Sequence, residues 1–243
     1  MLTSQELKSY AHLRRIKLID QAWKDYLQDL ALHLLYKKYP QIIFRGGTCI
    51  WKVMKGDRFS EDLDLCLGMI PNSLDMYLIK ELKLYGFICM IHKKKQTMNM
   101  LFLQCGIASP AHPREIMLSI EILASKLSSM NIDAVTLYSP YPDIPPIEIR
   151  VQRREDIIVD KISAIFQRNK ARDVHDLYLL LKQGGTINLE LVTGKISGFT
   201  IEKLREKIVE KKTSWKSLEP LIVTKLPSLE EEMTYILSFF KFQ

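Results

Sequence analysis

The sequence predicts an α+β fold with a helical C-terminal region, and three observations support this prediction. Residues 3–38 place apolar side chains at helical spacing. Residues 41–151 alternate short runs of β-forming residues with glycine and proline turns. The rest of the chain returns to helical spacing. We therefore expect a first domain over residues 1–185, which includes the N-terminal helix, and a helical region over residues 186–243.

The N-terminal helix has recognisable start and stop signals. Thr3 or Ser4 can cap its first turn, and Pro40 ends the helical pattern. The spacing weakens near residues 13–17, which indicates a break that divides the segment into two helices.

The middle region contains six segments that we expect to form strands. They are residues 41–45, 63–67, 87–91, 98–104, 115–123 and 147–151. Helices are expected over residues 48–55 and 74–84, and a proline-rich loop over residues 139–148. The third and fourth strands are expected to form a hairpin with residues 93–96, which include three lysines, at its tip.

The C-terminal part of the chain is expected to be helical throughout. The expected helices are residues 154–168, 172–183, 188–193, 199–211 and 228–240. Six basic residues follow one another closely in this part: Lys203, Arg205, Lys207, Lys211, Lys212 and Lys216. They and the hairpin lysines can contact RNA phosphates or simply form solvated faces.

Composition favours a folded protein with an anionic partner. Hydrophobic residues make up 47% of the 243 residues and charged residues 26%, so a packed core is expected and global disorder is not. Lys and Arg total 35 against 28 Asp and Glu, which gives a net charge of +7. This balance suits nucleic acid or a nucleotide, although solvated lysines alone would produce the same charge.

The cysteines and the chain start bear on the compartment. The four cysteines lie far apart, form no CxxC pair and sit in apolar stretches, which predicts buried free thiols in a reducing compartment. The first residues lack the basic start and apolar run of a signal peptide, and no stretch approaches the roughly 18 apolar residues of a membrane span. We expect a soluble cytoplasmic protein with no membrane partner.

The segment after the first expected strand has the features of a phosphate-binding turn. Gly46 and Gly47 let the backbone approach a ligand closely and expose amide groups. A helix that begins at Thr48 would add its positive N-terminal end, and the Thr48 hydroxyl can cap the helix or contact phosphate. Arg58 and Ser60 can also bind phosphate, or instead form an ion pair and a turn cap. Taken alone, a glycine pair after a strand is more often just a tight turn.

Two aspartates strengthen the phosphate interpretation. Asp62 and Asp64 stand at positions i and i+2 of an expected strand, so they face the same side, roughly 6–7 Å apart. Their carboxylates can converge on Mg²⁺, which prefers oxygen ligands, whereas the structural alternative is a solvated strand end. Glu121, inside an apolar strand, is the candidate third carboxylate, and Glu148 is its rival.

A second cluster of charged residues occupies two expected helices. Lys161 lies beside small and apolar residues, from which it can reach a bound triphosphate. Asp173 and Asp176 are three residues apart on the next helix, with His175 between them. The structural alternative is a solvated Lys161, an Arg172–Asp176 salt bridge and a structural histidine.

These two segments together resemble the AbiEii/AbiGii-type family of toxin nucleotidyltransferases. The first segment matches that family's GG[ST] turn and R-x-S-x-D-x-D run with Gly46, Gly47, Thr48, Arg58, Ser60, Asp62 and Asp64. The second matches its K-x-x-A and R-x-x-x-R-D-x-x-D-L patterns with Lys161, Ala164, Arg168, Arg172, Asp173, Asp176 and Leu177. The resemblance covers roughly residues 40–185, and the pair of motifs in this order is more specific than either alone.

The resemblance implies a nucleotidyltransferase-type mixed β-sheet flanked by helices, and a toxin role in a toxin–antitoxin or phage-defence pair. It implies that Asp62 and Asp64 bind Mg²⁺, with Mn²⁺ as the alternative ion, and that Lys161 holds a nucleoside triphosphate. Asp176 would complete the nucleotide site, and the glycine turn with Thr48 would cradle phosphate. Some members of the family add nucleotides to the 3′ end of transfer RNA, so an RNA acceptor and a cognate antitoxin are the implied partners.

Two other functions remain open at this point. The same site could transfer a nucleotide or phosphate to a protein, for example an antitoxin. A module that binds nucleotide or RNA without catalysis could also retain the scaffold, although such a module has no need of an aspartate pair. Transfer of labelled nucleotide to RNA, to protein or to neither separates the three.

Overall fold

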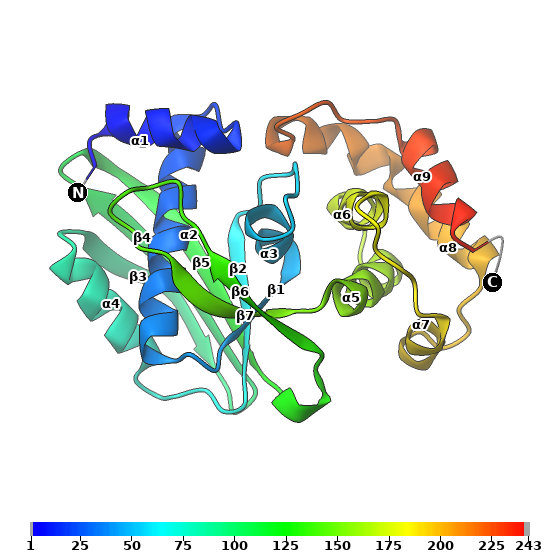
Figure 1. Ribbon diagram of the computed structural model, residues 1–243, viewed down its shortest axis with the longest axis horizontal. Helices are drawn as coiled ribbons and strands as arrows, with labels where there is room; N and C mark the ends of the chain where they lie inside the picture. Colours follow the sequence, from blue (N-terminus) through cyan, green and yellow to red (C-terminus); the bar gives the residue numbers. More distant parts are fainter. Residues whose placement is uncertain (1, 241–243) are drawn as a thin grey trace. The chain divides into compact units, whose positions relative to one another are not determined.

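The computed structural model describes residues 2–240, which form a seven-stranded sheet and a set of helices (Figure 1). The chain divides into two compact units. The sheet unit contains the residues up to Cys49 and residues Ser60–Gln152. The helical unit contains residues Ile50–Phe59 and the residues from Arg153 onward. The boundary after residue 185 that the sequence suggests stays a prediction.

The sheet is mixed, with strands in the order β3-β4-β5-β2-β1-β7-β6. Its strands are β1 (Ile43–Arg45), β2 (Asp62–Leu67), β3 (Ile88–Gln96), β4 (Met100–Ser109), β5 (His112–Ala124), β6 (Ile132–Leu137) and β7 (Ile147–Gln152). β2 pairs in parallel with β5, and β1 in parallel with β7, while the other neighbours are antiparallel. The two parallel pairs meet at the centre of the sheet, where β1 pairs with β2.

Helices of the sheet unit cover one face of this sheet (Figure 1). They are α2 (Ile19–Lys38) and α4 (Leu74–Leu84), and α1 (Ser4–Ala11) packs on α2. The sheet unit also contains the short 3₁₀ helices η1 (His12–Arg14) and η2 (Leu127–Ser129). Leu27, Leu30 and Leu34 of α2 are buried, as are Leu63 and Leu65 of β2. Burial of these apolar side chains, each worth roughly 1.5–3 kcal/mol, holds the layers together.

The helical unit contains α5 (Arg154–Gln167), α6 (Arg172–Lys182), α7 (Leu189–Lys195), α8 (Ile201–Val209), η3 (Glu210–Leu221) and α9 (Leu229–Ser238). α3 (Gly46–Lys52) begins in the sheet unit and ends in the helical unit. The α5–α6 pair forms its centre, and α9 packs on α6. A mixed sheet with flanking helices and a helical C-terminal region confirms the predicted α+β class.

Most predicted elements are present with shifted ends. The predicted N-terminal break is confirmed, because Arg15 adopts a left-handed conformation with φ of 59° between α1 and α2. α3 begins at Gly46 rather than at Thr48 and ends at Lys52 rather than at residue 55. Lys55, with φ of 52°, leaves the helical conformation, and the Gly56 amide donates to the Ile50 carbonyl and closes the turn.

Two predictions in the less regular segments were wrong, and one strand was missed. The hairpin lysines do not form the tip, because β3 continues to Gln96 and the reversal occurs at residues 97–99, where the Thr97 amide donates to the Met100 carbonyl at 2.8 Å. Strand β6 was not expected; it is an edge strand, and of its six residues only Leu137 is buried. The helix expected up to residue 211 ends at Val209 and continues as the 3₁₀ helix η3, which contains Pro220.

Cys49, Cys66 and Cys105 are buried free thiols and Cys89 is half-buried, in line with the sequence. Burial, together with the nearby charge of Asp64, raises the pKa of the Cys49 thiol well above its ordinary value, so this thiol stays protonated. Among residues 2–240, no helix combines the length and the apolar character needed to cross a lipid bilayer.

Candidate active site

The two predicted metal ligands lie side by side on strand β2 of the sheet unit. Along this strand Leu63 and Leu65 are buried under the helices, while Asp62 and Asp64 are half-buried on the opposite face. Because side chains alternate along a strand, the two carboxylates share one face. We call this face of the sheet the acid face.

Sheet register distinguishes the two candidates for a third carboxylate. Glu121 of β5 is the direct cross-strand partner of Asp64, and Ser119 is the partner of Asp62. Directly opposed side chains have Cβ atoms about 4.5–5.5 Å apart and point to the same face, so Glu121 joins the two aspartates. Glu148 lies on β7, with β1 between it and β2, and is paired with Thr136. The register therefore groups Glu121, and not Glu148, with the acid pair.

Arg45 is the residue of this site that the sequence analysis left without a role. It is the last residue of β1 and stands opposite Asp64, on the other side from Glu121. Its guanidinium donates to the Cys66 sulfur at 3.5 Å. A row of Glu121, Asp64 and Arg45 thus crosses three neighbouring strands, and the arginine places a positive charge beside Asp64. The sequence feature that could have identified Arg45 as a site residue is its position directly before Gly46.

The glycine turn at Gly46 and Gly47 lies against β2, the strand that carries Asp62 and Asp64 and that we call the acid strand. Gly46 has φ of +74°, and a Cβ at this position would lie 2.8 Å from Cβ and Cγ of Asp64. The Thr48 side chain is buried, and its hydroxyl donates a short hydrogen bond to the Asp62 carbonyl. This bond ties α3 to β2, so in this conformation the Thr48 hydroxyl is neither a helix cap nor free to contact phosphate. Backbone amides are what the turn can offer to a ligand.

Ser60 is buried and lies two residues before the start of β2. Its carbonyl accepts a hydrogen bond of 3.0 Å from Nε2 of Gln28 on α2, and the same amide group donates to the Glu61 carbonyl at 2.9 Å. The chain is therefore fixed immediately before the first aspartate. In residues 2–240, no group of three His, Cys, Asp or Glu side chains forms a ready-made metal cage. Mg²⁺ usually binds one or two carboxylates and completes its shell with water and substrate phosphates, so an open carboxylate cluster fits this ion.

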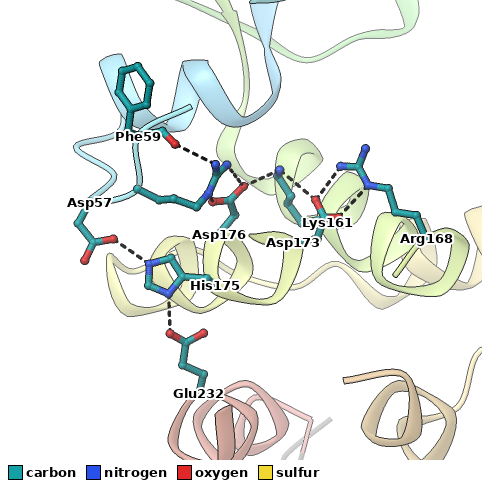
Figure 2. A network of polar contacts seen from close by, with 9 residues as sticks. Asp57, Phe59, Lys161, Arg168, Asp173, His175, Asp176 and Glu232 are labelled. Carbon is teal, nitrogen blue, oxygen red and sulfur yellow. Dashed lines mark hydrogen bonds and ion pairs between the residues drawn. The ribbon is translucent and has the colours of Figure 1, made fainter. Parts of the chain in front are cut away.

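Charged residues of the helical unit form a separate buried network (Figure 2). Asp176 of α6 accepts two hydrogen bonds from the Arg58 guanidinium, at 2.8 and 2.9 Å, and forms an ion pair of 2.6 Å with Lys161 of α5. Arg58 also donates to the Phe59 carbonyl at 3.1 Å. All three charged side chains are buried, with Lys161 6% exposed. The sequence left open whether Arg58 binds phosphate or forms an ion pair. In this structure Arg58 forms an ion pair with Asp176.

Lys161 has a second acidic neighbour, Asp173, at 3.3 Å. Asp173 in turn accepts two hydrogen bonds of 2.8 Å from the Arg168 guanidinium. Each acid that Lys161 contacts therefore has a two-point arginine partner of its own. Lys161 is therefore buried and paired, not solvated. Asp176 pairs with Arg58 and Lys161 and not with Arg172, so these two parts of the structural alternative were wrong.

The charges of this network control protonation. Burial alone would raise the pKa of Asp176, but the neighbouring charges of Arg58 and Lys161 outweigh burial and hold it well below its ordinary value. Asp176 is therefore ionised at neutral pH. Removing a cationic partner from a buried carboxylate of this kind strongly destabilises the fold, because the carboxylate charge is then left uncompensated.

His175 makes a structural connection within the helical unit. Its Nδ1 lies 2.6 Å from Glu232 of α9 and its Nε2 lies 2.9 Å from Asp57, in the loop after α3 (Figure 2). Burial lowers the pKa of His175, but the hydrogen bonds to Asp57 and Glu232 and their charges raise it to about 9. The imidazolium therefore holds two carboxylates together at neutral pH, which fits the structural interpretation of this histidine.

The predicted site residues thus fall into two groups, one in each unit. The sheet unit brings together Gly46, Gly47, Thr48, Ser60, Asp62, Asp64 and Glu121. The helical unit brings together Arg58, Lys161 and Asp176. Asp57 and Glu232 were missed because their partner, His175, is 118 and 57 residues away from them in sequence.

The sequence model of one protein family matches the chain. This family is the AbiEii nucleotidyl transferase toxins of type IV toxin–antitoxin systems, and the match covers residues 25–228. The matched range includes both groups of site residues. A search of curated protein sequences found no significant match.

Three solved structures share the fold. A candidate nucleotidyltransferase from H. pylori has 22% identity and a TM-score of 0.65, with 90% of this chain and 92% of the other covered. JHP933 from Helicobacter pylori has 22% identity and a TM-score of 0.59, covering 91% and 90%. MenT4, a nucleotidyltransferase toxin from Mycobacterium tuberculosis H37Rv, has 20% identity and a TM-score of 0.65, covering 100% and 89%.

Proposed function

Because this chain belongs to the AbiEii family of nucleotidyltransferase toxins, we propose that it transfers a nucleotide from a nucleoside triphosphate to the 3′ end of an RNA. The observation that carries the proposal is the register of the central sheet, in which Glu121 stands opposite Asp64 and on the face that Asp62 shares. A triad of half-buried carboxylates on one sheet face calls for a compensating cation.

Asp62, Asp64 and Glu121 would hold Mg²⁺ or Mn²⁺. The chemistry that such an ion supplies is charge stabilisation on the phosphates and a lowered pKa for a bound hydroxyl. The protein's own part is to hold the three carboxylates on one face of the sheet. Gly46 contributes by leaving the space that the Asp64 carboxylate occupies. Arg45 lies on the far side of Asp64 and limits repulsion between the acids.

The glycine turn would bind the phosphates through its backbone. Gly46, Gly47 and Thr48 carry amide groups next to the acid strand, and the hydrogen bond from Thr48 to Asp62 fixes their position relative to it. The Thr48 side chain is buried and acts by holding the backbone, and Ser60 is buried just before the strand that carries the aspartates. Backbone amides in such a turn provide donors that cost no reorganisation when phosphate arrives.

In the helical unit, Lys161 would be the residue that binds the triphosphate. If Lys161 turns away, each of the two acids that it contacts keeps two hydrogen bonds from an arginine: Asp176 keeps those from Arg58, and Asp173 keeps those from Arg168. Arg58 and Asp176 then act as positioning residues for Lys161. Lys161 is therefore the residue of the helical unit that we propose to contact the nucleotide.

In the reaction, the 3′ hydroxyl of the acceptor attacks the α-phosphorus. A new phosphodiester bond forms, the bond between the α-phosphorus and its bridging oxygen breaks, and pyrophosphate leaves while the hydroxyl proton is lost to water. The net charge of +7 favours an RNA acceptor over a protein. The cytoplasm, where RNA and triphosphates are abundant, is the proposed site of action, and a cognate antitoxin is the proposed protein partner.

The test is transfer of α-labelled triphosphates to cellular RNA in the presence of Mg²⁺ or Mn²⁺. Wild-type protein should label RNA, and Asp64→Asn should reduce the rate at least about a hundredfold, because a ligand charge is lost where charge develops. Glu61→Gln is the matched control, since Glu61 is exposed, adjacent to Asp62 and paired with Lys24. Label that migrates with protein instead, or full transfer by Asp64→Asn, would refute the proposal.

A further inference from the structure

The acid face of the sheet continues beyond the carboxylates toward the β3 edge. Phe102 of β4 is the direct cross-strand partner of Glu121, and Lys95 of β3 is the partner of Phe102. Gln104 of β4 similarly stands opposite Ser119 on one side and Lys93 on the other. Because directly paired residues share a face, all of these side chains lie on the face that carries Asp62 and Asp64.

Two contacts confirm this assignment of faces within the sheet unit. The Lys93 ammonium lies 5.6 Å from the centre of the Phe102 ring, in a cation–π arrangement. Lys94, between the other two lysines, points the opposite way and pairs with Asp75 of α4 at 2.5 Å. Helix α4 therefore marks the covered face, and Lys93 and Lys95 belong to the acid face.

This part of the face is accessible. Lys93 and Lys95 are exposed on an edge strand, and Phe102, Gln104 and Ser119 are half-buried. Within residues 2–240, neither Lys93 nor Lys95 forms an ion pair. An aromatic ring, an amide and two ammonium groups that form no ion pair within the described residues thus extend from the carboxylates to the edge of the sheet.

We propose that Phe102, Lys93 and Lys95 form the platform that binds the single-stranded 3′ end of the acceptor RNA. The inference rests on the proposed function, because the carboxylates at one end of the platform are taken as the catalytic centre. The Lys93 ammonium moves from the Phe102 ring to an RNA phosphate, a base stacks on the ring in its place, and the phosphates on either side of that base contact the two lysines. Because Phe102 pairs directly with Glu121, the Cβ atoms of these two residues are about 4.5–5.5 Å apart, so a base stacked on the Phe102 ring lies beside a carboxylate of the proposed catalytic centre.

The layout fits a polymer better than a free nucleotide. Lys93 and Lys95 are two positions apart on a strand, roughly 6–7 Å, a span of about two stacked nucleotides. They lie beyond Phe102 on the side away from the acids, where a triphosphate bound to the acids has no phosphate. A strand of RNA has phosphates on both sides of each base and would contact both.

The experiment compares binding and catalysis in lysine variants. A fluorescent oligo(U) of about twelve nucleotides, within the range of single-strand site sizes, is titrated at several salt concentrations. The double variant Lys93→Gln/Lys95→Gln should bind at least roughly tenfold more weakly, and its slope of log K against log salt should fall by about 0.7 for each lysine. In transfer assays its KM for RNA should rise while its KM for triphosphate stays unchanged.

Lys94→Gln is the matched control, because it removes the same charge from the same strand on the covered face. It should keep wild-type RNA affinity and KM. If each lysine variant weakens binding equally, net charge accounts for the effect and the platform is wrong. A change confined to the KM for triphosphate would also overturn it, as would a wild-type protein that does not bind the oligonucleotide.

Phe102 is tested by Phe102→Leu and Phe102→Tyr, with melting temperatures measured for both. Phe102→Leu, which keeps an apolar side chain but cannot stack, should lose about tenfold in RNA affinity, and Phe102→Tyr should retain it. Lysine variants that transfer nucleotide to RNA with wild-type kinetics refute the platform and leave the proposed function intact. RNA binding with the expected lysine dependence but no transfer by wild-type protein refutes the proposed function alone.

Discussion

Gly46 and Asp64 approach so closely that no side chain fits at position 46. A Cβ there would lie 2.8 Å from Cβ and Cγ of Asp64, shorter than real Cβ contacts, and the φ of +74° is one that glycine adopts without strain. One residue thus gives the glycine turn its direction and leaves room for the aspartate. The turn and the carboxylate are a single structural feature, although they belong to different elements of the chain.

Gly46→Ala should therefore strain the backbone and also disturb the carboxylate cluster of Asp62, Asp64 and Glu121. We expect Asp64 to be displaced, with a loss of nucleotide transfer of at least about tenfold and a destabilisation above the roughly 1–2 kcal/mol of left-handed strain. Gly184→Ala is the control, because Gly184 has φ of +86° and a Cβ added there would meet nothing within 4 Å. Denaturant unfolding and transfer rates, measured for both, should show strain in both variants and lost activity only in Gly46→Ala.

The third carboxylate can be identified by a pair of conservative changes. Glu121→Gln should reduce transfer at least roughly tenfold, with a higher requirement for Mg²⁺, because it removes a charge directly opposite Asp64. Glu148→Gln should have no effect, since Glu148 lies on β7 with β1 between it and the acid strand. Rates as a function of Mg²⁺ concentration provide the measurement. Equal effects, or a larger effect of Glu148→Gln, would contradict the assignment.

The local part of the site could be predicted from the sequence because it depends on local geometry. Asp62 and Asp64 share a face on any strand, and the glycines before a helix mark a turn wherever the fold places them. The leucines of α2 and the i, i+3 spacing of Asp173 and Asp176 follow from helical geometry in the same way. These inferences need no knowledge of which elements meet.

The remaining part depends on pairing between distant segments. Glu121 could be preferred over Glu148 only once the β2–β5 register was known, and that register joins residues 57 positions apart, as Asp64 and Glu121 are. The Arg58–Asp176 pair spans 118 residues. Strand β6 escaped prediction because an exposed edge strand buries too little to show an apolar pattern.

His175 makes the stability of the helical unit dependent on pH. Its pKa is raised to about 9 in the folded protein from 6.5, so its contribution is fully present below pH 6.5 and is lost as the pH rises through about 9. The free energy of unfolding should fall over this range by at most about 3 kcal/mol. Urea unfolding between pH 6 and 9.5 measures it. His175→Gln should be less stable at pH 6 and show a flatter profile; an unchanged profile would contradict the assignment.

Lys161 and Asp176 should separate catalysis from stability. Asp176→Ala removes the two-point partner of buried Arg58, and leaving a buried charge uncompensated typically costs about 3–5 kcal/mol. Lys161→Met leaves Asp176 with Arg58 and Asp173 with Arg168, so it should cost only about 1–2 kcal/mol. If Lys161 holds the triphosphate, this milder variant should still raise the KM for triphosphate at least roughly tenfold. Melting curves and transfer kinetics on both proteins decide the matter: a Lys161→Met protein that is stable and binds triphosphate normally would show that the lysine serves only the buried network.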